Sequence, residues 1–229
     1  MIDRHLLYNP LYDAGRVAAD GCSLPTARLA TGKAMVRYAT AFTQCLNKAW
    51  APVIERAGFE FRPPAAVHPA PTGTESVCGV MDEDVGAFYC DTDLGIYFNW
   101  PSYAVPGASQ EGIGASVQYL IAHEYGHHVQ FLTGISDSYD DRYSAAANDA
   151  ARQVDQNRSE MQAHCFATAF FGANRRTLRI RGERLAHYGH IGYDRSEKDM
   201  VNFDRWLRQG FTKGPGGCGT WAASAGEVS

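Results

Sequence analysis

The residues best suited to chemistry lie in the segment His123–His127, which reads HEYGH. Two histidines spaced four apart on a helix lie one turn above each other, so both imidazoles can reach one metal ion. Glu124 follows the first histidine and can take a proton from a water molecule that the metal activates. The spacing therefore predicts a metal site at His123 and His127, with Glu124 as the general base.

The surrounding sequence predicts the helix that this geometry needs. Apolar residues recur at helical spacing through the motif, at Ile113, Val117, Leu120, Ile121, Tyr125 and Leu132. Gly134 follows the last of them as a stop signal. The alternative is a surface helix with two solvated histidines, and the apolar neighbours argue against it. His128 directly follows the second histidine and should face away from the pair, as a structural or supporting residue.

A catalytic zinc ion needs three protein ligands and one open position, so a third ligand must come from elsewhere in the chain. The residues that follow His127 lack the Gly and His of the metzincin pattern, which excludes that class. A carboxylate on a second helix is the alternative. Glu160 stands at the head of the apolar segment 161–171, which should pack inside. It is our candidate, against the alternative of an exposed polar residue.

The composition fits a compact globular protein of 229 residues, with 45% hydrophobic and 20% charged residues and a net charge of -4. The main basic cluster, residues 175–184, is interleaved with apolar residues and resembles the solvated face of a helix, which argues against nucleic-acid binding. No stretch approaches the roughly 18 apolar residues of a membrane span. We expect a protein without a membrane span or a nucleic-acid partner, and a monomer.

The chain as a whole, residues 1–229, is expected to form one α+β domain. Residues 1–28 should be an irregular arm, and 29–134 a long helix, a small and mostly antiparallel sheet, and the motif helix on which the sheet packs. Neighbouring antiparallel strands are expected at 87–90 and 95–100. Residues 135–221 should be mainly helical, and residues 222–229 a frayed tail.

The six cysteines form no Cys-x-x-Cys pair, which argues against a cysteine zinc site. Their even number suggests three disulfides and an oxidising compartment, and the alternative is six buried thiols in a cytosolic enzyme. A Cys22–Cys45 disulfide would pin the arm to the first long helix. The first residues contain no signal peptide. We expect a secreted or extracytoplasmic protein whose leader is absent from this chain.

Two segments, Leu120–Gln130 and Glu160–Ala167, resemble the neutral zinc metallopeptidases of bacteria, a family related to the gluzincins. The resemblance covers roughly residues 70–220, and the arm resembles that of secreted actinobacterial members. It implies a zincin-like fold that binds Zn²⁺ through His123, His127 and Glu160, with Glu124 as the general base. It also implies two disulfides, Cys78–Cys90 and Cys165–Cys218.

This sequence departs from the family at His164, where an aspartate is usual. That aspartate lies one turn after the glutamate and would orient a ligand histidine. His164 could instead hydrogen-bond to a ligand as a neutral imidazole, or replace Glu160 as the third ligand.

The function predicted from these observations is a zinc endopeptidase that cleaves peptide or protein substrates. A donor should stabilise the oxyanion of the reaction. The candidates are His187, Tyr188, His190 and Tyr193. Two alternatives remain. A metal-dependent deacylase of small molecules would have a small, closed pocket, and a non-catalytic binding module stabilised by zinc would have a fourth protein ligand.

Overall fold

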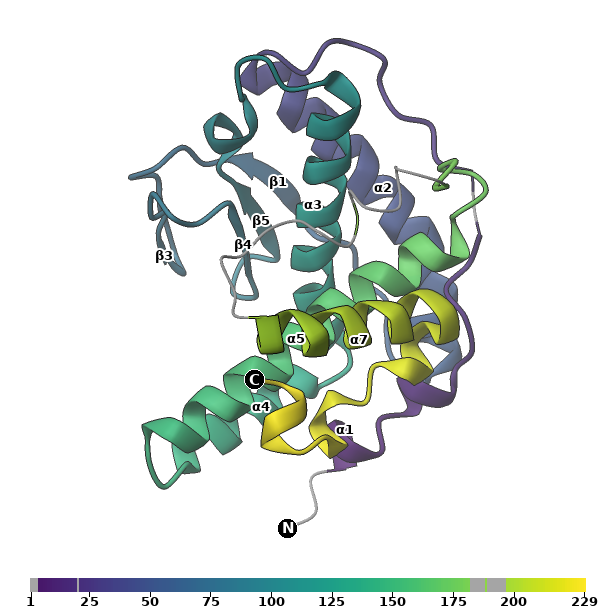
Figure 1. The fold of residues 1–229 in the computed structure, drawn as a ribbon, viewed down its shortest axis with the longest axis vertical. Helices are drawn as coiled ribbons and strands as arrows, with labels where there is room; N and C mark the ends of the chain where they lie inside the picture. Colours follow the sequence, from purple (N-terminus) through teal and green to yellow (C-terminus); the bar gives the residue numbers. More distant parts are fainter. Residues whose placement is uncertain (1–3, 20, 182–187, 189–196) are drawn as a thin grey trace.

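The computed structural model describes residues 4–19, 21–181, 188 and 197–229. The chain forms an α+β fold in which helices predominate (Figure 1). The helices are α1 (Arg4–Leu7), α2 (Gly32–Arg56), α3 (Gln110–Leu132), α4 (Ile135–Ala145), α5 (Asp149–Ala173) and α7 (Glu197–Lys213). The strands are β1 (Ala66–Pro69), β2 (Glu75–Ser76), β3 (Gly79–Val80), β4 (Ala87–Cys90) and β5 (Gly95–Phe98). Short 3₁₀ turns are η1 (Pro10–Asp13), η2 (Trp100–Tyr103), η3 (Gly214–Gly217), η4 (Thr220–Ala222) and η5 (Ala225–Glu227).

Helix α2 closes one side of the core, at the place where the sequence predicts a long helix. Thr31 caps it, since its side chain accepts a hydrogen bond from the Ala34 N–H at 3.3 Å. The buried face of α2 is apolar, and Phe42 packs edge-on against Phe170 of α5 with ring centroids 5.5 Å apart. This contact joins the N-terminal and C-terminal halves of the chain in one core.

The main sheet has the strand order β1-β5-β4, and β2 and β3 form a separate hairpin. The predicted antiparallel pair is confirmed, with Ala87 of β4 opposite Phe98 of β5. The expectation of a mostly antiparallel sheet is wrong for this sheet, because β1 pairs with β5 in parallel. Three strands lie between β1 and β5 in the chain, which gives room for the return that a parallel pairing needs. β5 is therefore the central strand, and β4 is an edge.

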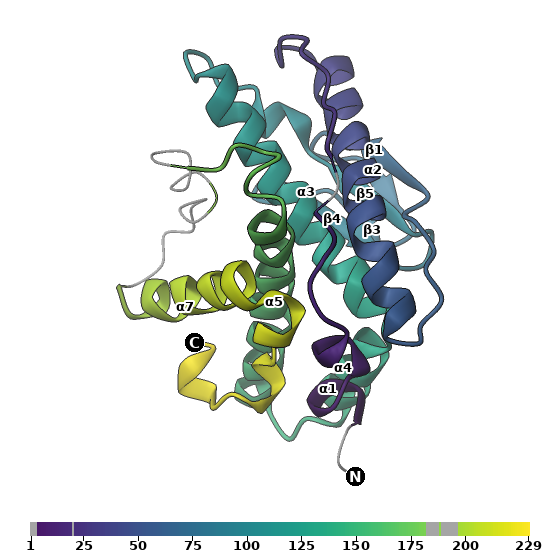
Figure 2. The same ribbon diagram turned by 90° about the vertical axis from the view of Figure 1, so that its right-hand side faces the viewer.

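The two faces of the sheet pack on different neighbours. Val67, Ile96 and Phe98 join the main core, where α2 packs against β1 and α3 against β4. Tyr97 points to the other face and belongs to a small cluster with Met81. Figure 2 shows α5 and α7 on the side of α3 that faces away from the sheet. Helix α3 thus lies between the sheet and the helical half.

Helix α3 crosses α5 at direct backbone contact. The predicted motif helix is confirmed over Gln110–Leu132, and Gly134 beyond it adopts a left-handed φ of 70°. A Cβ atom at Gly126 would lie 2.6 Å from the carbonyl oxygen of Ala163, closer than such atoms approach. Only glycine therefore fits, and its small size brings the motif helix against the segment of α5 that carries Glu160.

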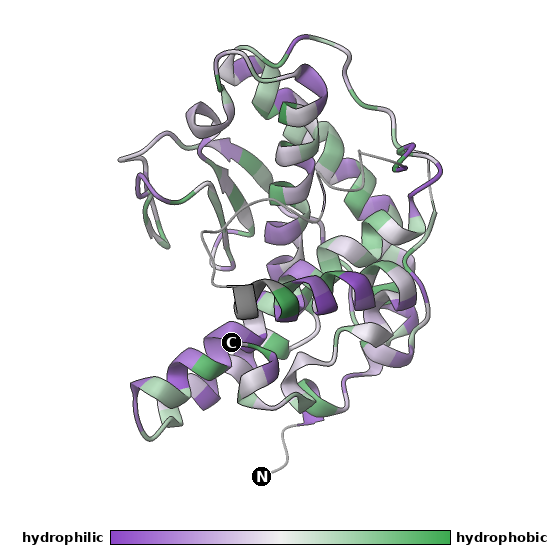
Figure 3. Ribbon diagram, viewed as in Figure 1, coloured by the Kyte–Doolittle hydropathy of each residue, from purple (hydrophilic) through white to green (hydrophobic). Residues whose placement is uncertain are grey.

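The C-terminal half is helical as predicted, with α5 longer than expected. Helix α5 begins at Asp149 because Asn148 caps it, accepting a hydrogen bond from the Ala151 N–H at 2.9 Å. Figure 3 shows that α4 and the first turns of α5 are mostly hydrophilic. Apolar periodicity therefore does not indicate where these helices begin and end. The basic cluster at 175–184, which resembles the face of a helix, is not helical in its described part: residues 174–179 form turns, and residues 182–187 lie outside the described residues.

The C-terminal tail packs against α7, which corrects the expectation of a frayed segment at 222–229. Val228 is fully buried. The side-chain amide of Asn202 donates hydrogen bonds to the carbonyls of Gly226 and Ser229 at 2.9 and 2.8 Å. Polar groups on α7 thus hold backbone that has no periodic pattern of its own.

Three disulfides join the predicted pairs, Cys22–Cys45, Cys78–Cys90 and Cys165–Cys218. They tie the arm to α2, the hairpin region to β4, and the C-terminal segment to α5. Because disulfides persist in oxidising surroundings, they indicate that the protein works in such an environment. Among the described residues, no helix has the length and apolar character needed to cross a membrane.

Candidate metal centre

Three side chains converge between α3 and α5. The Nε2 atoms of His123 and His127 lie 3.3 Å apart. The carboxylate of Glu160 reaches both, with Oε2 3.3 Å from His123 Nε2 and Oε1 3.6 Å from His127 Nε2. A tetrahedral ion with bonds of about 2.0–2.1 Å holds its ligand atoms about 3.3–3.4 Å apart. The three separations therefore fit a cation of the size of zinc.

The charges of these side chains also favour a cation. Burial opposes the imidazolium form of His127, but Glu160 and Glu124 outweigh it and raise the pKa of His127 to about 9. Burial opposes the ionisation of Glu160 as well, yet the two histidines hold the pKa of Glu160 well below its usual range. Without a metal the cluster therefore keeps a proton at neutral pH, and a divalent cation would displace it.

Glu124 is buried in the same place, and only 5% of its surface is exposed. Burial is the main influence on this carboxyl and raises the pKa of Glu124, while both histidines and the backbone N–H of Tyr89 act in the opposite direction. A carboxylate with a raised pKa is a better proton acceptor near neutral pH. The position and environment of Glu124 suit the predicted role of general base.

Gln130 fixes the orientation of His127, a role that was not predicted from the sequence. Its Oε1 lies 2.9 Å from His127 Nδ1, which donates the hydrogen bond and leaves Nε2 directed at Glu160. The amide of Gln130 in turn donates to the Ser159 carbonyl at 2.9 Å and to the side chain of Gln162 at 3.1 Å. A supporting acceptor of this kind orients a ligand histidine and raises its basicity. The position of Gln130 one turn after His127 is the sequence feature that could have indicated this role.

His128 connects α3 to the sheet and points away from the other two histidines. Its Nε2 lies 2.7 Å from the Arg62 carbonyl, and its Nδ1 lies 2.9 Å from the Tyr89 hydroxyl. Because a carbonyl can only accept, Nε2 carries the proton and Nδ1 accepts from Tyr89. Burial lowers the pKa of His128 to about 4, so the ring is neutral at physiological pH. The contact holds β4 beside the metal-ligand cluster.

His164 lies one turn after Glu160 and stacks on His123, with ring centroids 4.0 Å apart and planes inclined by 29°. Its Nδ1 lies 3.0 Å from the Tyr119 hydroxyl. The Nδ1 atom of His123 is buried and has no hydrogen-bond partner in the part of the chain that the structure describes. The acceptor that an aspartate would offer to this nitrogen is therefore missing.

Of the four candidate oxyanion donors, Tyr188 falls within the described residues. It is buried, its hydroxyl donates to Gln118 at 2.7 Å, and it does not line the cavity over the metal-ligand cluster. Outside the described residues lie His187, His190 and Tyr193. Tyr139 of α4, which was not predicted as a site residue, does line that cavity.

This cavity, here called the cleft, has a volume of about 510 Å³ and is walled by α3, α4, α5 and strand β4. Besides Glu124 and Glu160, the described residues of its lining include Asp91 after β4 and Asp140 on α4, and no lysine or arginine. Burial, and then the charge of Asp91, raises the pKa of Asp140. The charges of the two aspartates therefore interact, and the cleft favours cationic groups.

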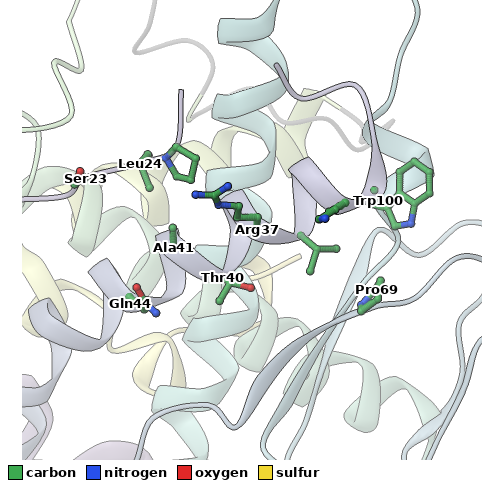
Figure 4. A pocket seen from close by; sticks show the side chains of 12 residues that line it. Ser23, Leu24, Arg37, Thr40, Ala41, Gln44, Pro69 and Trp100 are labelled. Atoms are coloured by element: carbon green, nitrogen blue, oxygen red, sulfur yellow. The ribbon is translucent and has the colours of Figure 1, made fainter. Parts of the chain in front are cut away.

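A larger cavity of about 930 Å³, here called the groove, lies beside the other edge strand of the sheet (Figure 4). It is lined by the arm, α2, Pro69 of β1 and Trp100 of η2. Figure 4 shows Arg37 extending from α2 between Leu24 and Trp100. Lys33 and Arg37 are its charged side chains, and both are exposed.

The comparisons with known proteins identify the family. Residues 15–185 match the family described as "Putative neutral zinc metallopeptidase". The uncharacterized protein Rv2575 of Mycobacterium tuberculosis is 31% identical over 139 residues, which cover 56% of this chain and 44% of the relative. The uncharacterized protein YpfJ of Escherichia coli K12 is 32% identical over 119 residues, covering 52% of this chain and 41% of the relative.

The chain spans less than half the length of these curated relatives. No solved structure matches it. The family match covers most of the chain and includes the motif helix, Glu160 and the cleft between them. This chain therefore belongs to that neutral zinc metallopeptidase family.

Proposed function

We propose that this chain is a secreted, zinc-dependent endopeptidase with a zincin-like active site. The observation that carries the proposal is the convergence of His123, His127 and Glu160 at the separations of zinc ligands, with Glu124 buried beside them. Membership of the family supports zinc and hydrolysis. The three disulfides support a place outside the cytoplasm.

The residues around the cluster would divide the reaction between them. Zinc held by the three ligands would polarise the carbonyl of the scissile peptide bond and lower the pKa of water to about 7. Glu124 takes the proton from the attacking water and then donates it to the nitrogen of the leaving amine. Gln130 keeps His127 oriented throughout the reaction, because the Gln130 side chain is hydrogen-bonded to the Ser159 carbonyl of α5.

Strand β4 is suited to hold an extended peptide. It is an edge of the sheet, and Ala87, Phe88 and Tyr89 line the cleft. The Gly86 carbonyl accepts the Asn99 N–H at 2.9 Å, which directs the backbone groups of Ala87 and Tyr89 away from β5; the Tyr89 N–H contacts Glu124, and the other groups remain for a substrate. A substrate strand could pair with this edge and pass its peptide bond over the metal-ligand cluster.

The same features weigh against the two alternatives. A small-molecule deacylase would use a closed pocket, whereas the cleft runs beside an open strand edge. A binding module stabilised by zinc would need a fourth protein ligand. The nearest candidate among the described residues is His164, one of whose ring nitrogens lies within 4.8 Å of ligand atoms of His123 and Glu160. Its ring stacks on His123 and its Nδ1 contacts the Tyr119 hydroxyl, an arrangement that we interpret as support of His123 rather than ligation of the metal.

The substitution Glu124→Gln tests the proposed function. It should leave the zinc content unchanged and lower the hydrolysis of casein or a fluorogenic peptide by about 10²–10⁴-fold, because only the proton acceptor is lost. Glu55→Gln, at an exposed position on α2, is the matched control and should retain full activity. Full activity in Glu124→Gln would refute the assignment of the general base.

A further inference from the structure

Among the residues that the structure describes, the proposed ligand His123 finds no partner for a contact that its role calls for. Its Nε2 faces His127 and Glu160, so the ring proton must sit on Nδ1 when Nε2 binds a metal. A ligand histidine almost always donates this second N–H to an acceptor, which fixes the ring and raises its basicity. His127 follows that pattern through Gln130. His123 does not, because its buried Nδ1 has no partner among the described residues.

His164 covers the face of the His123 ring instead. The rings stack at 4.0 Å, and only 3% of His164 is exposed. His164 is itself held in place, since its Nδ1 lies 3.0 Å from the Tyr119 hydroxyl and Phe203 packs edge-on against it at 4.9 Å. Tyr119 lies one turn before His123 on α3. The contacts thus run from α3 to α5 and back to the same helix.

We propose that His164 is a positioning residue that holds the plane of the His123 ring by stacking, in place of a hydrogen bond to Nδ1. The proposal rests on the zinc site of the proposed function. Stacking restrains the tilt of the ring but does not raise the basicity of Nε2 as a hydrogen bond would. The site therefore binds zinc less tightly than one with an acceptor at position 164.

The affinity for zinc, measured by competition with a chromophoric chelator, tests this role with three substitutions. His164→Phe keeps a flat ring without nitrogen atoms and should stay within about threefold of the unaltered protein, while His164→Ala should weaken binding about tenfold. His164→Asp offers an acceptor to Nδ1 and should strengthen binding about tenfold. Equal losses in His164→Phe and His164→Ala would show that the nitrogens matter, and would overturn the proposal. Unchanged affinity in His164→Ala would overturn it too.

X-ray absorption of zinc bound to the unaltered protein gives a second readout, which does not depend on the folding of any variant. The proposal expects two imidazoles on the metal. A third imidazole, for which His164 is the nearest candidate among the described residues, would overturn it. Thermal unfolding of each metal-free variant separates lost zinc affinity from lost structure. Tyr119→Phe, which removes only the hydroxyl at His164, should weaken zinc binding less than His164→Ala.

The outcomes separate this inference from the proposed function. A protein that binds zinc and cleaves no peptide would contradict the peptidase, while the zinc affinities of the His164 variants would still be measurable. A protein that cleaves peptides but loses zinc equally in His164→Phe and His164→Ala would overturn only the stacking role.

Discussion

The two cavities beside the sheet differ in what their polar residues do. The smaller cavity is the cleft along β4. There His123, His127 and Glu160 are in mutual contact, and Gln130, which is itself hydrogen-bonded to α5, orients His127. In the groove beside β1, which has the larger volume, the cations are exposed side chains on a single helix. Size therefore does not identify the functional cavity here, whereas the convergence of ionisable groups from two helices does.

The cavities also have opposite charge. Within the described part of the chain, the lining of the cleft contains four acidic residues, Asp91, Glu124, Asp140 and Glu160, and no lysine or arginine. The lining of the groove, as far as it is formed by described residues, contains Lys33 and Arg37 and no acidic residue. If the cleft alone binds substrate, replacing its ionisable side chains should change metal binding and substrate specificity. Replacing the basic side chains of the groove should change neither.

The largest effect is expected from His127→Ala, which removes one of three proposed zinc ligands. Zinc affinity should fall by more than about 100-fold, the upper limit seen for residues that only support a ligand. Metal analysis after dialysis would measure the loss. His68→Ala is the control, because His68 stacks on Tyr97 outside the cleft. Stoichiometric zinc in His127→Ala would contradict the proposed metal centre.

A smaller effect is expected from Asp140→Asn, which removes one negative charge from the rim of the cleft. The kcat/KM for peptides with lysine or arginine near the cleaved bond should fall about two- to fivefold, the range of exposed charge pairs. The difference should shrink at high salt, because ions screen exposed charges. Asp141→Asn changes a neighbouring residue that does not line the cleft and should have less effect. If Asp140→Asn and Asp141→Asn lowered kcat/KM equally, Asp140 would have no specific role in substrate binding.

The smallest effect is expected from the double substitution of Lys33 and Arg37 by glutamine. Zinc content and peptide hydrolysis should change by less than about twofold, because isolated surface substitutions rarely alter a distant site. Steady-state kinetics with a protein substrate would measure this. A large rise in KM for casein, with no change for a short peptide, would show that the groove also binds substrate and would remove the contrast between the cavities.

Local sequence patterns predicted the parts of the site that lie on one helix. The spacing of His123 and His127 and the apolar stripe around them depend only on helical periodicity, so both could be read from the sequence. The disulfide partners of Cys78 and Cys165 came from the resemblance to a family rather than from spacing, because sequence alone does not fix connectivity.

The parts that could not be predicted depend on contacts between distant segments. The bond between His128 and Tyr89 joins residues 39 apart in the chain, and no pattern links them. The parallel pairing of β1 with β5 is likewise set by the path of the chain between them. The tail was expected to fray because it lacks periodicity, yet side-chain donors on α7 hold its backbone.

The close approach at Gly126 has a consequence for anyone who wishes to transplant this centre. Because the Ala163 backbone lies where a side chain would begin, the distance between the two helices determines whether the carboxylate meets the imidazoles. Copying five residues onto another scaffold would move two of the three donors and leave the third behind. The smallest portable unit is a pair of crossed helices together with the glycine at their intersection.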